Sequence, residues 1–181
     1  MAIGIYRWNW MYTGQCGMSS GVLQRSGLVD GPIAFLAYGN TAFWATIITD
    51  VWIGVPMVTL YFLAALQAIP KDLYEAAWTD GAGRMYRFRR VTLPLMLPAI
   101  ITMSMLSTIA TFNSFDIIWI LTQGGPSGST TTMIIDTYQT AIGSKKYGEG
   151  AARAVAICIF LSLFCFAYFR VTRRISPEKF A

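Results

Sequence analysis

The chain has no histidine, only three cysteines and few charged residues among its 181 positions. Without histidine it lacks the commonest general base and the commonest nitrogen ligand for metals. Cys16, Cys158 and Cys165 form neither a disulfide framework nor a metal-binding spacing. No GxxxxGK[ST] segment occurs, so the chain is not expected to carry a nucleotide phosphate loop. These absences predict that the chain binds no metal and no cofactor of its own.

The scarcity of charge also argues against a soluble domain. Charged residues make up 13% of the chain, whereas about 25% is usual in soluble domains. Hydrophobic residues make up 55%, and the mean hydropathy is +0.49. Three apolar stretches, at 42–66, 95–121 and 151–169, are long enough for helices that cross a bilayer, which needs roughly 20 residues. The sequence therefore predicts an all-α, polytopic membrane protein with at least three transmembrane helices.

The basic residues predict how these spans are oriented. Most of them lie in the loop at 70–94 and in the tail at 170–181, whereas the loop between the second and third spans has only two lysines. Positive charge marks the cytoplasmic side, so that loop and the C-terminus are expected inside. The net charge of +5 then reflects topology. Because the basic residues cluster at span ends, no nucleic-acid partner is expected.

The segment before the first span, 1–41, has two interpretations. Its first twelve residues, MAIGIYRWNWMY, are too short to span and lack the pattern of a signal peptide. They either lie in the membrane interface or form the end of a span whose beginning is missing, and we favour the second. An external loop would follow. The chain is thus expected to be the C-terminal part of a larger membrane domain, without its N-terminal spans.

The loop at 70–94 has the pattern of two short helices joined by a turn. Pro70 suits the first turn of a helix, which predicts a helix over 71–79. Asp80-Gly81 should end it, because glycine tolerates the left-handed geometry of a sharp reversal. A second helix is expected over 84–90, and Pro94 should begin the next span. Positive-inside patterning alone explains the arginines but leaves the acid, the alanines and the glycine unexplained.

The same loop carries the motif Glu75-Ala76-Ala77-x3-Gly81-x9-Val91-x-Leu93-Pro94. It resembles the EAA loop of permease subunits in binding-protein-dependent ABC importers of the type I fold, with valine at position 91 in place of the commoner isoleucine. Segments 66–74 and 112–126 resemble the sugar-importer branch. The resemblance assigns contact with an ATPase to the following residues: Glu75, Ala76, Ala77, Asp80, Gly81, Val91, Leu93 and Pro94.

The resemblance also implies partners and a location. A second permease, expected to form a heterodimer with this one, two ATPase subunits and an external solute-binding protein would complete an importer in a bacterial inner membrane. The ATPase would use the ATP, and this chain would perform no bond chemistry. Sugars or oligosaccharides are the expected cargo. The alternatives are glycerol phosphate or other polyols, and an inactive, truncated remnant.

Polar residues inside the spans form two stripes at helical spacing. One contains Asp50, Gly54, Met57 and Tyr61, and the other contains Ser104, Ser107, Thr111 and Ser114. At about 1.5 Å per residue, Asp50, Thr111 and Ser114 should reach the same depth. Small polar residues often serve helix packing alone.

By the resemblance, the following residues would instead border the substrate pathway: Asp50, Gly54, Met57, Thr111 and Ser114. Asn113 and Asp116, nearer the external end, are expected to form either helix caps or gate contacts. An enzymatic pair of Asp50 and Asp116 is disfavoured, because the two acids lie at different depths. Outside, the turn-rich segment 123–129 and a predicted helix at 130–141 are either a connector or a docking site for the binding protein.

Overall fold

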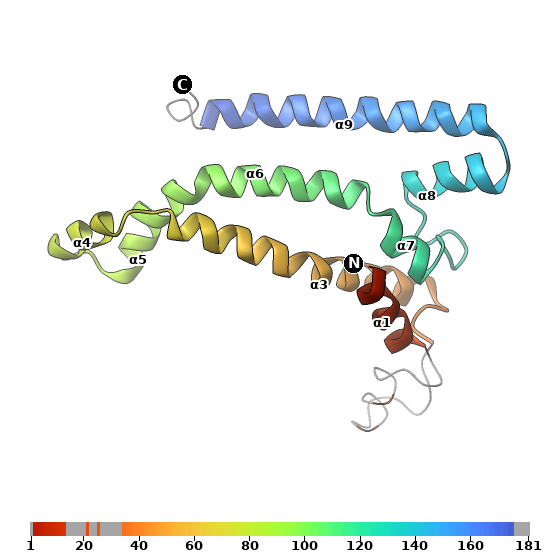
Figure 1. Cartoon of the computed structure of the whole chain (residues 1–181), viewed down its shortest axis with the longest axis horizontal. Helices are drawn as coiled ribbons and strands as arrows, with labels where there is room; N and C mark the ends of the chain where they lie inside the picture. Colours follow the sequence, from red (N-terminus) through yellow and green to blue (C-terminus); the bar gives the residue numbers. More distant parts are fainter. Residues whose placement is uncertain (1, 14–20, 22–24, 26–33, 176–181) are drawn as a thin grey trace. The chain divides into compact units, whose positions relative to one another are not determined.

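A computed structural model describes residues 2–13, 21, 25 and 34–175, and within these residues it contains helices and turns but no strand. The helices are coloured along the sequence in Figure 1. Their bounds are α1 Ala2–Tyr12, α3 Gly39–Gln67, α4 Lys71–Thr79, α5 Arg84–Arg87, α6 Leu93–Phe112, α7 Phe115–Leu121, α8 Met133–Tyr138 and α9 Tyr147–Ile175, with π-helical segments η1 Phe88–Thr92 and η2 Gln139–Gly143. The predicted all-α class is confirmed.

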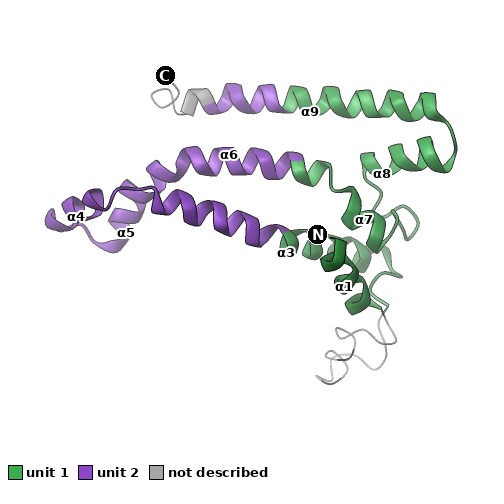
Figure 2. Ribbon diagram, viewed as in Figure 1, with its two compact units in different colours: residues 1–53, 110–164 green, residues 54–109, 165–181 purple. Residues whose placement is uncertain are grey.

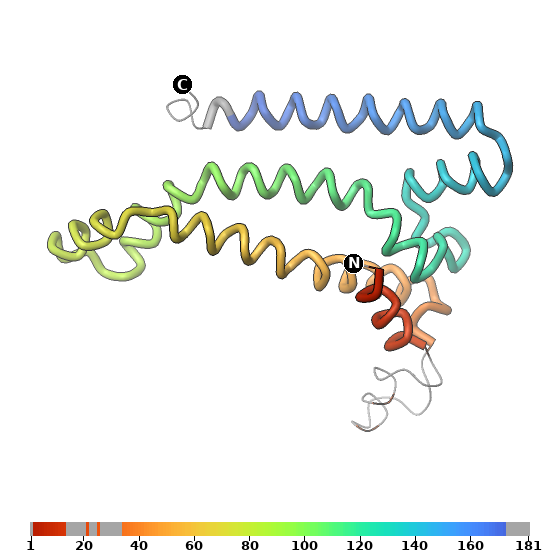
Figure 3. The backbone as a smooth tube through the Cα atoms, in the orientation of Figure 1, coloured from red at the N-terminus to blue at the C-terminus, as the bar shows by residue number. Residues whose placement is uncertain are grey.

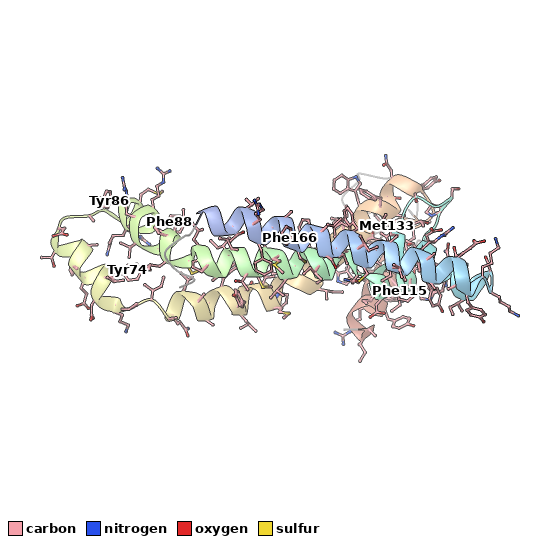
Figure 4. All side chains as sticks on the ribbon, turned by 90° about the horizontal axis from the view of Figure 1, so that it is seen from above. Tyr74, Tyr86, Phe88, Phe115, Met133 and Phe166 are labelled. Carbon is pink, nitrogen blue, oxygen red and sulfur yellow. The ribbon has the colours of Figure 1, made fainter. Side chains whose placement is uncertain are left out.

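Three helical stretches in the described part of the chain are long and apolar enough to cross a membrane: Gly39–Gln67, Arg84–Phe112 and Tyr147–Thr172. In the most apolar window of the third stretch no residue is buried, and Leu163 and Phe166 are 64% and 67% exposed. Figure 4 shows Phe166 among the side chains that project from α9. Such continuous apolar surface far exceeds what a soluble monomer exposes, so lipid or partner helices must cover it.

The chain divides into two compact units, coloured separately in Figure 2. Unit 1 comprises residues 1–53 and 110–164, and unit 2 comprises 54–109 and 165–181. The core of unit 1 forms where α1 packs on α7 and α3, and its buried members are Ile5, Tyr12, Ala45, Ile117 and Leu121. The Asn9 side-chain amide donates to the Ile120 carbonyl at 2.8 Å, which satisfies an acceptor at the end of α7.

The polar end of unit 1 is held by contacts between α8, η2 and the start of α9. Arg153 donates to the carboxylate of Asp136 and to the hydroxyl of Thr140. Gly150 allows the backbones to approach, because a Cβ there would lie 2.5 Å from the Cβ of Ala141. The helix expected at 130–141 is therefore observed as α8 and η2, shifted toward the C-terminus.

The predicted single helix over 95–121 is wrong, because the chain leaves helical geometry at Ser114 (φ −73°, ψ 72°). The turn closes with short-range bonds, from the Asn113 amide to the Ala110 carbonyl and from the Ser114 amide to the Thr111 carbonyl, both at 3.1 Å. Asparagine and serine compete for backbone hydrogen bonds and favour helix ends. Figure 3 follows the backbone from α6 through this break into α7.

Candidate coupling loop and intramembrane polar contacts

The first half of the candidate coupling loop, residues 70–94, is the helix α4. It begins after Pro70, whose backbone (φ −57°, ψ 134°) is extended, and Asp72 in its first turn favours the positive end of the helix dipole. No residue of α4 is buried, whereas Ile69, directly before Pro70, is 8% exposed. The helix predicted over 71–79 is confirmed with the same bounds.

Gly81 makes the reversal that follows α4. Its φ of +74° lies in the left-handed region, where a side chain would be strained. The reversal is tight, since the Gly81 amide donates to the Trp78 carbonyl and the Ala82 amide to the Ala77 carbonyl, both at 2.9 Å. The predicted glycine turn is therefore confirmed. Ala76 and Ala77 lie in the last turn of α4, directly before it.

The second half of the loop differs from the prediction of a separate helix over 84–90. Helix α5 passes into the π-helical segment η1 and then into α6 without a break. The Leu93 amide donates to the Phe88 carbonyl, five residues back, which widens the helix directly before Pro94. Proline lacks an amide hydrogen and its ring crowds the carbonyl of the preceding turn, so a wider turn relieves that conflict.

One contact joins the two halves of the loop. The Tyr74 hydroxyl of α4 lies 2.9 Å from the Thr92 hydroxyl of η1, and Thr92 is only 8% exposed. The sequence does not predict this pair, because it leaves open how α4 is rotated toward η1.

The outer surface of the loop combines acids with large apolar side chains. Glu75, Ala76 and Asp80 are exposed. Beside them Trp78 is 72% exposed and Met85 is 63% exposed, and Figure 4 labels Tyr86 and Phe88 on the same part of the chain. Exposed tryptophan beside charge is typical of surfaces that bind another protein.

The remaining motif residues, Val91, Leu93 and Pro94, sit where η1 becomes α6. Val91 is half-buried, and Leu93 and Pro94 are exposed. Of the eight predicted motif residues, the structure thus brings those of α4 and the turn onto one hairpin, and it puts the last three at its return into the span.

In unit 1, two of the five predicted substrate-pathway residues meet. The Ser114 hydroxyl donates to the Asp50 carboxylate at 3.1 Å, and both side chains are half-buried. The break after α6 makes this possible, because Ser114 stands as the residue before α7 and makes no capping bond to that helix. A carboxylate held in this way keeps its second oxygen for another donor.

The other three predicted pathway residues are not part of this contact. Thr111 is exposed in the last turn of α6, and its backbone carbonyl accepts from the Ser114 amide. Gly54 and Met57 belong to unit 2, and Met57 is 72% exposed. Their assignment to the substrate pathway stays a prediction. Asp116 lies in the first turn of α7, as expected for a residue that favours a helix start.

The loop after α7 is held by its own side chains. The Thr131 hydroxyl donates to the Gly124 carbonyl at 3.0 Å, and the Gln139 side-chain amide donates to the Gln123 carbonyl at 2.9 Å. Gly124 has φ +89°, and a Cβ there would lie 2.8 Å from the Thr131 hydroxyl. The turn expected at 123–129 is thus an ordered element on α8 and η2.

The described part of the chain contains no group of three or more histidine, cysteine or acidic residues that could hold a metal ion.

Comparison with known proteins places these features in a family. The family described as "Binding-protein-dependent transport system inner membrane component" matches residues 16–180. The trehalose/maltose transport system permease protein MalF of Thermococcus litoralis is 39% identical over 92% of this chain. The sn-glycerol-3-phosphate transport system permease protein UgpA of Agrobacterium fabrum is 32% identical over 93% of it. The chain spans 55% and 57% of the length of these two relatives.

A solved bacterial alginate ABC transporter, in complex with an alginate pentasaccharide-bound periplasmic protein, has the same fold. One of its chains superposes with a TM-score of 0.85 over 96% of this chain and 60% of its own length, at 21% sequence identity. At that identity the likeness establishes the fold alone. The family match, which covers nearly all of the sequence, establishes more: this chain belongs to the inner membrane components of binding-protein-dependent transport systems.

Proposed function

We propose that this chain is the transmembrane subunit of an ATP-driven importer, and that residues 70–94 dock on an ATPase and transmit its motion to the spans. The observation that carries the proposal is the hairpin of α4 and α5 around Gly81, which presents Glu75 and Trp78 to the surroundings. Its second half continues without a break into the transmembrane helix α6. A displacement at the hairpin therefore reaches the membrane through a stiff helix.

The assembly we propose has a second permease, two ATPase subunits that bind and hydrolyse ATP, and an external solute-binding protein. Its location is a bacterial inner membrane, with the coupling loop and the C-terminus in the cytoplasm, as the arginines of the loop favour. The chain itself performs no bond chemistry and binds no cofactor. The ordered loop at 123–131 is the external surface that we assign to the binding protein.

Reversal of a single charge tests the docking role. Glu75→Lys is expected to reduce co-purification of the ATPase, because an exposed acid on the docking helix is replaced by a base. Glu149→Lys is the matched control, since Glu149 is also exposed and forms only a surface ion pair with Lys146 at 3.1 Å, a kind of pair worth about 0–1 kcal/mol. Equal co-purification and equal uptake in both variants would overturn the docking role.

For the cargo we propose sugars or oligosaccharides, with the Asp50–Ser114 contact, Gly54, Met57 and Thr111 along the pathway. A carboxylate and hydroxyls suit a ligand rich in hydroxyl groups. A glycerol phosphate ester is the second candidate, because one relative bears that name. It is disfavoured by α3 and α6, which contain no lysine or arginine to neutralise a phosphate.

Uptake experiments separate the two cargoes. Proteoliposomes with the whole importer would be loaded with ATP and offered labelled maltose, trehalose or glycerol 3-phosphate. We expect saturable uptake of a sugar, and Asp50→Ala should raise its half-saturation concentration by about 10- to 100-fold, the range for a lost hydrogen bond to a charged group. Uptake of glycerol 3-phosphate alone would favour the second cargo. Failure to transport any solute, with an ATPase bound, would identify an inactive remnant.

A further inference from the structure

The last turns of α9 belong to the same compact unit as the coupling loop and α6, whereas the helix up to Phe164 belongs to unit 1. Within unit 2, Tyr168 of α9 contacts α6 directly. Its hydroxyl donates to the Ile101 carbonyl at 2.8 Å and lies 2.5 Å from the Ser104 hydroxyl. We infer that Tyr168 is a positioning residue that fixes the C-terminal part of α9 to α6, so that α9 follows when the coupling loop displaces α6. This inference rests on the proposed function.

The hydrogen bonds fix the two helices in either arrangement of the hydroxyl hydrogens. The Ser104 hydroxyl also lies 2.9 Å from the Ile101 carbonyl, and each hydroxyl has a single hydrogen to donate. If Tyr168 donates to Ile101, Ser104 can donate to Tyr168. If Ser104 donates to Ile101, Tyr168 can donate to Ser104. The first arrangement has two cross-helix hydrogen bonds and the second has one, so α9 is bonded to α6 in both cases.

The membrane makes this contact durable. Ile101 and Ser104 lie in the span Arg84–Phe112, and Tyr168 lies in the span Tyr147–Thr172. In hydrocarbon no water replaces a lost partner, so a tyrosine hydroxyl that leaves α6 would be left unsatisfied. The half-buried Tyr168 ring and its hydrogen bonds to Ile101 and Ser104 therefore oppose sliding of α9 against α6.

The position on α6 suits transmission of movement. Ile101 lies eight residues after Leu93, about 12 Å along the helix from the end of the coupling loop. The helical backbone is continuous from Arg84 to Phe112. The far end of α9 is fixed within unit 1, where Arg153 binds Asp136 and Thr140. Thus α9 makes side-chain hydrogen bonds within each unit, and in unit 1 its Phe160 ring also contacts the Phe112 ring of α6.

Distance measurements between α6 and α9 test the inference in the whole importer. The three cysteines are replaced by serine, and spin labels are attached at Leu106 and Val171, which are 52% and 58% exposed. Distances are recorded without nucleotide and after trapping with ATP and vanadate. In the unmodified background we expect one separation that is the same in both states. In Tyr168→Phe, the ratio of the population at that separation to the population at all other separations should fall about 3- to 20-fold, the range for one interhelical hydrogen bond.

Two further variants complete the design. Ser104→Ala retains the bond from Tyr168 to Ile101, so it should have a smaller effect, and it serves as the test if Tyr168→Phe does not assemble. Tyr61→Phe on α3, whose ring contacts Phe62, removes a tyrosine hydroxyl from another span and should leave the separation unchanged.

The outcomes separate the two proposals. Equal distance distributions for Tyr168→Phe, Ser104→Ala and the unmodified protein would overturn the role of Tyr168. A single separation in Tyr168→Phe, with the ATPase still active as measured by phosphate release, would do the same. If even the unmodified chain binds no ATP-hydrolysing subunit, the proposed function itself fails.

Discussion

Gly81 and Gly83 flank the same turn but differ in backbone conformation, and this difference gives a matched pair of substitutions. A Cβ at either position meets nothing within 4 Å. Gly81 has φ +74°, whereas Gly83, the residue before α5, has φ −65°. Gly81→Ala should therefore cost about 1–2 kcal/mol and weaken ATPase binding about 5- to 30-fold, while Gly83→Ala should be neutral. Titration of the ATPase onto the permease in nanodiscs measures both. Equal affinities for the two variants would mean that the turn conformation is unimportant for docking.

Gly148 and Gly150 form a second matched pair, in the first turns of α9. A Cβ at Gly148 would meet no atom within 4 Å. A Cβ at Gly150 would lie 3.0 Å from the Cα of Ala141, as well as 2.5 Å from the Cβ of Ala141. Gly148→Ala should stabilise the protein by about 0.5–1 kcal/mol, since alanine favours a helix. Gly150→Ala should destabilise it by about 1–3 kcal/mol through overpacking. Thermal unfolding in detergent gives the sign of each change, and a stabilising Gly150→Ala would contradict the close approach of η2 and α9.

At the level of elements, the coupling loop depends on the bond between α4 and η1. Tyr74→Phe and Thr92→Val each remove one hydroxyl, and either change should cost about 0.5–1.5 kcal/mol. The double variant should cost little more than one of them, because both act on the same contact. Amide hydrogen exchange in α4, measured for the three variants and the unmodified protein, gives the opening free energies needed for a double-mutant cycle. Strict additivity would indicate that the two hydroxyls do not interact.

The sequence predicted those elements whose local signals agree. For α4, the proline at its start, the early acid and the glycine after it all indicate the same bounds, and the structure has them. The break at Ser114 was missed, because the polar pair Asn113-Ser114 lies between two apolar runs that together have the length of one span. The break also brings Ser114 to Asp50, which is 64 residues away in the chain, and no local pattern shows that contact. The π-helical turn before Pro94 was missed as well, since composition does not distinguish a wide turn from a regular one.

The contacts of the candidate site were predicted unevenly for the same reason. Residue counts along two antiparallel spans were enough to predict that Asp50 and Ser114 lie at the same depth, which agrees with their hydrogen bond. It was not enough to find Tyr74 with Thr92 or Tyr168 with Ser104, because helix rotation decides which side chains face each other. That rotation is set by how the helices pack, which a single sequence does not determine.

For the whole molecule, the testable consequence is the side of the membrane on which each loop lies. Three environments can be probed with single cysteines, placed at Met85 in the coupling loop, Ser127 in the loop after α7 and Phe166 in α9. In the described structure Met85 and Phe166 are 63% and 67% exposed, and Ser127 is exposed. With the native cysteines replaced by serine, a membrane-impermeant maleimide should label Ser127→Cys in intact spheroplasts. It should label Met85→Cys only after permeabilisation, because the arginines around it favour the cytoplasmic position that we propose for this loop. Phe166→Cys should resist labelling in both conditions, because its exposed surface faces hydrocarbon, where little thiolate forms. Labelling of Met85→Cys in intact spheroplasts would place the coupling loop outside, beyond the reach of any cytoplasmic ATPase.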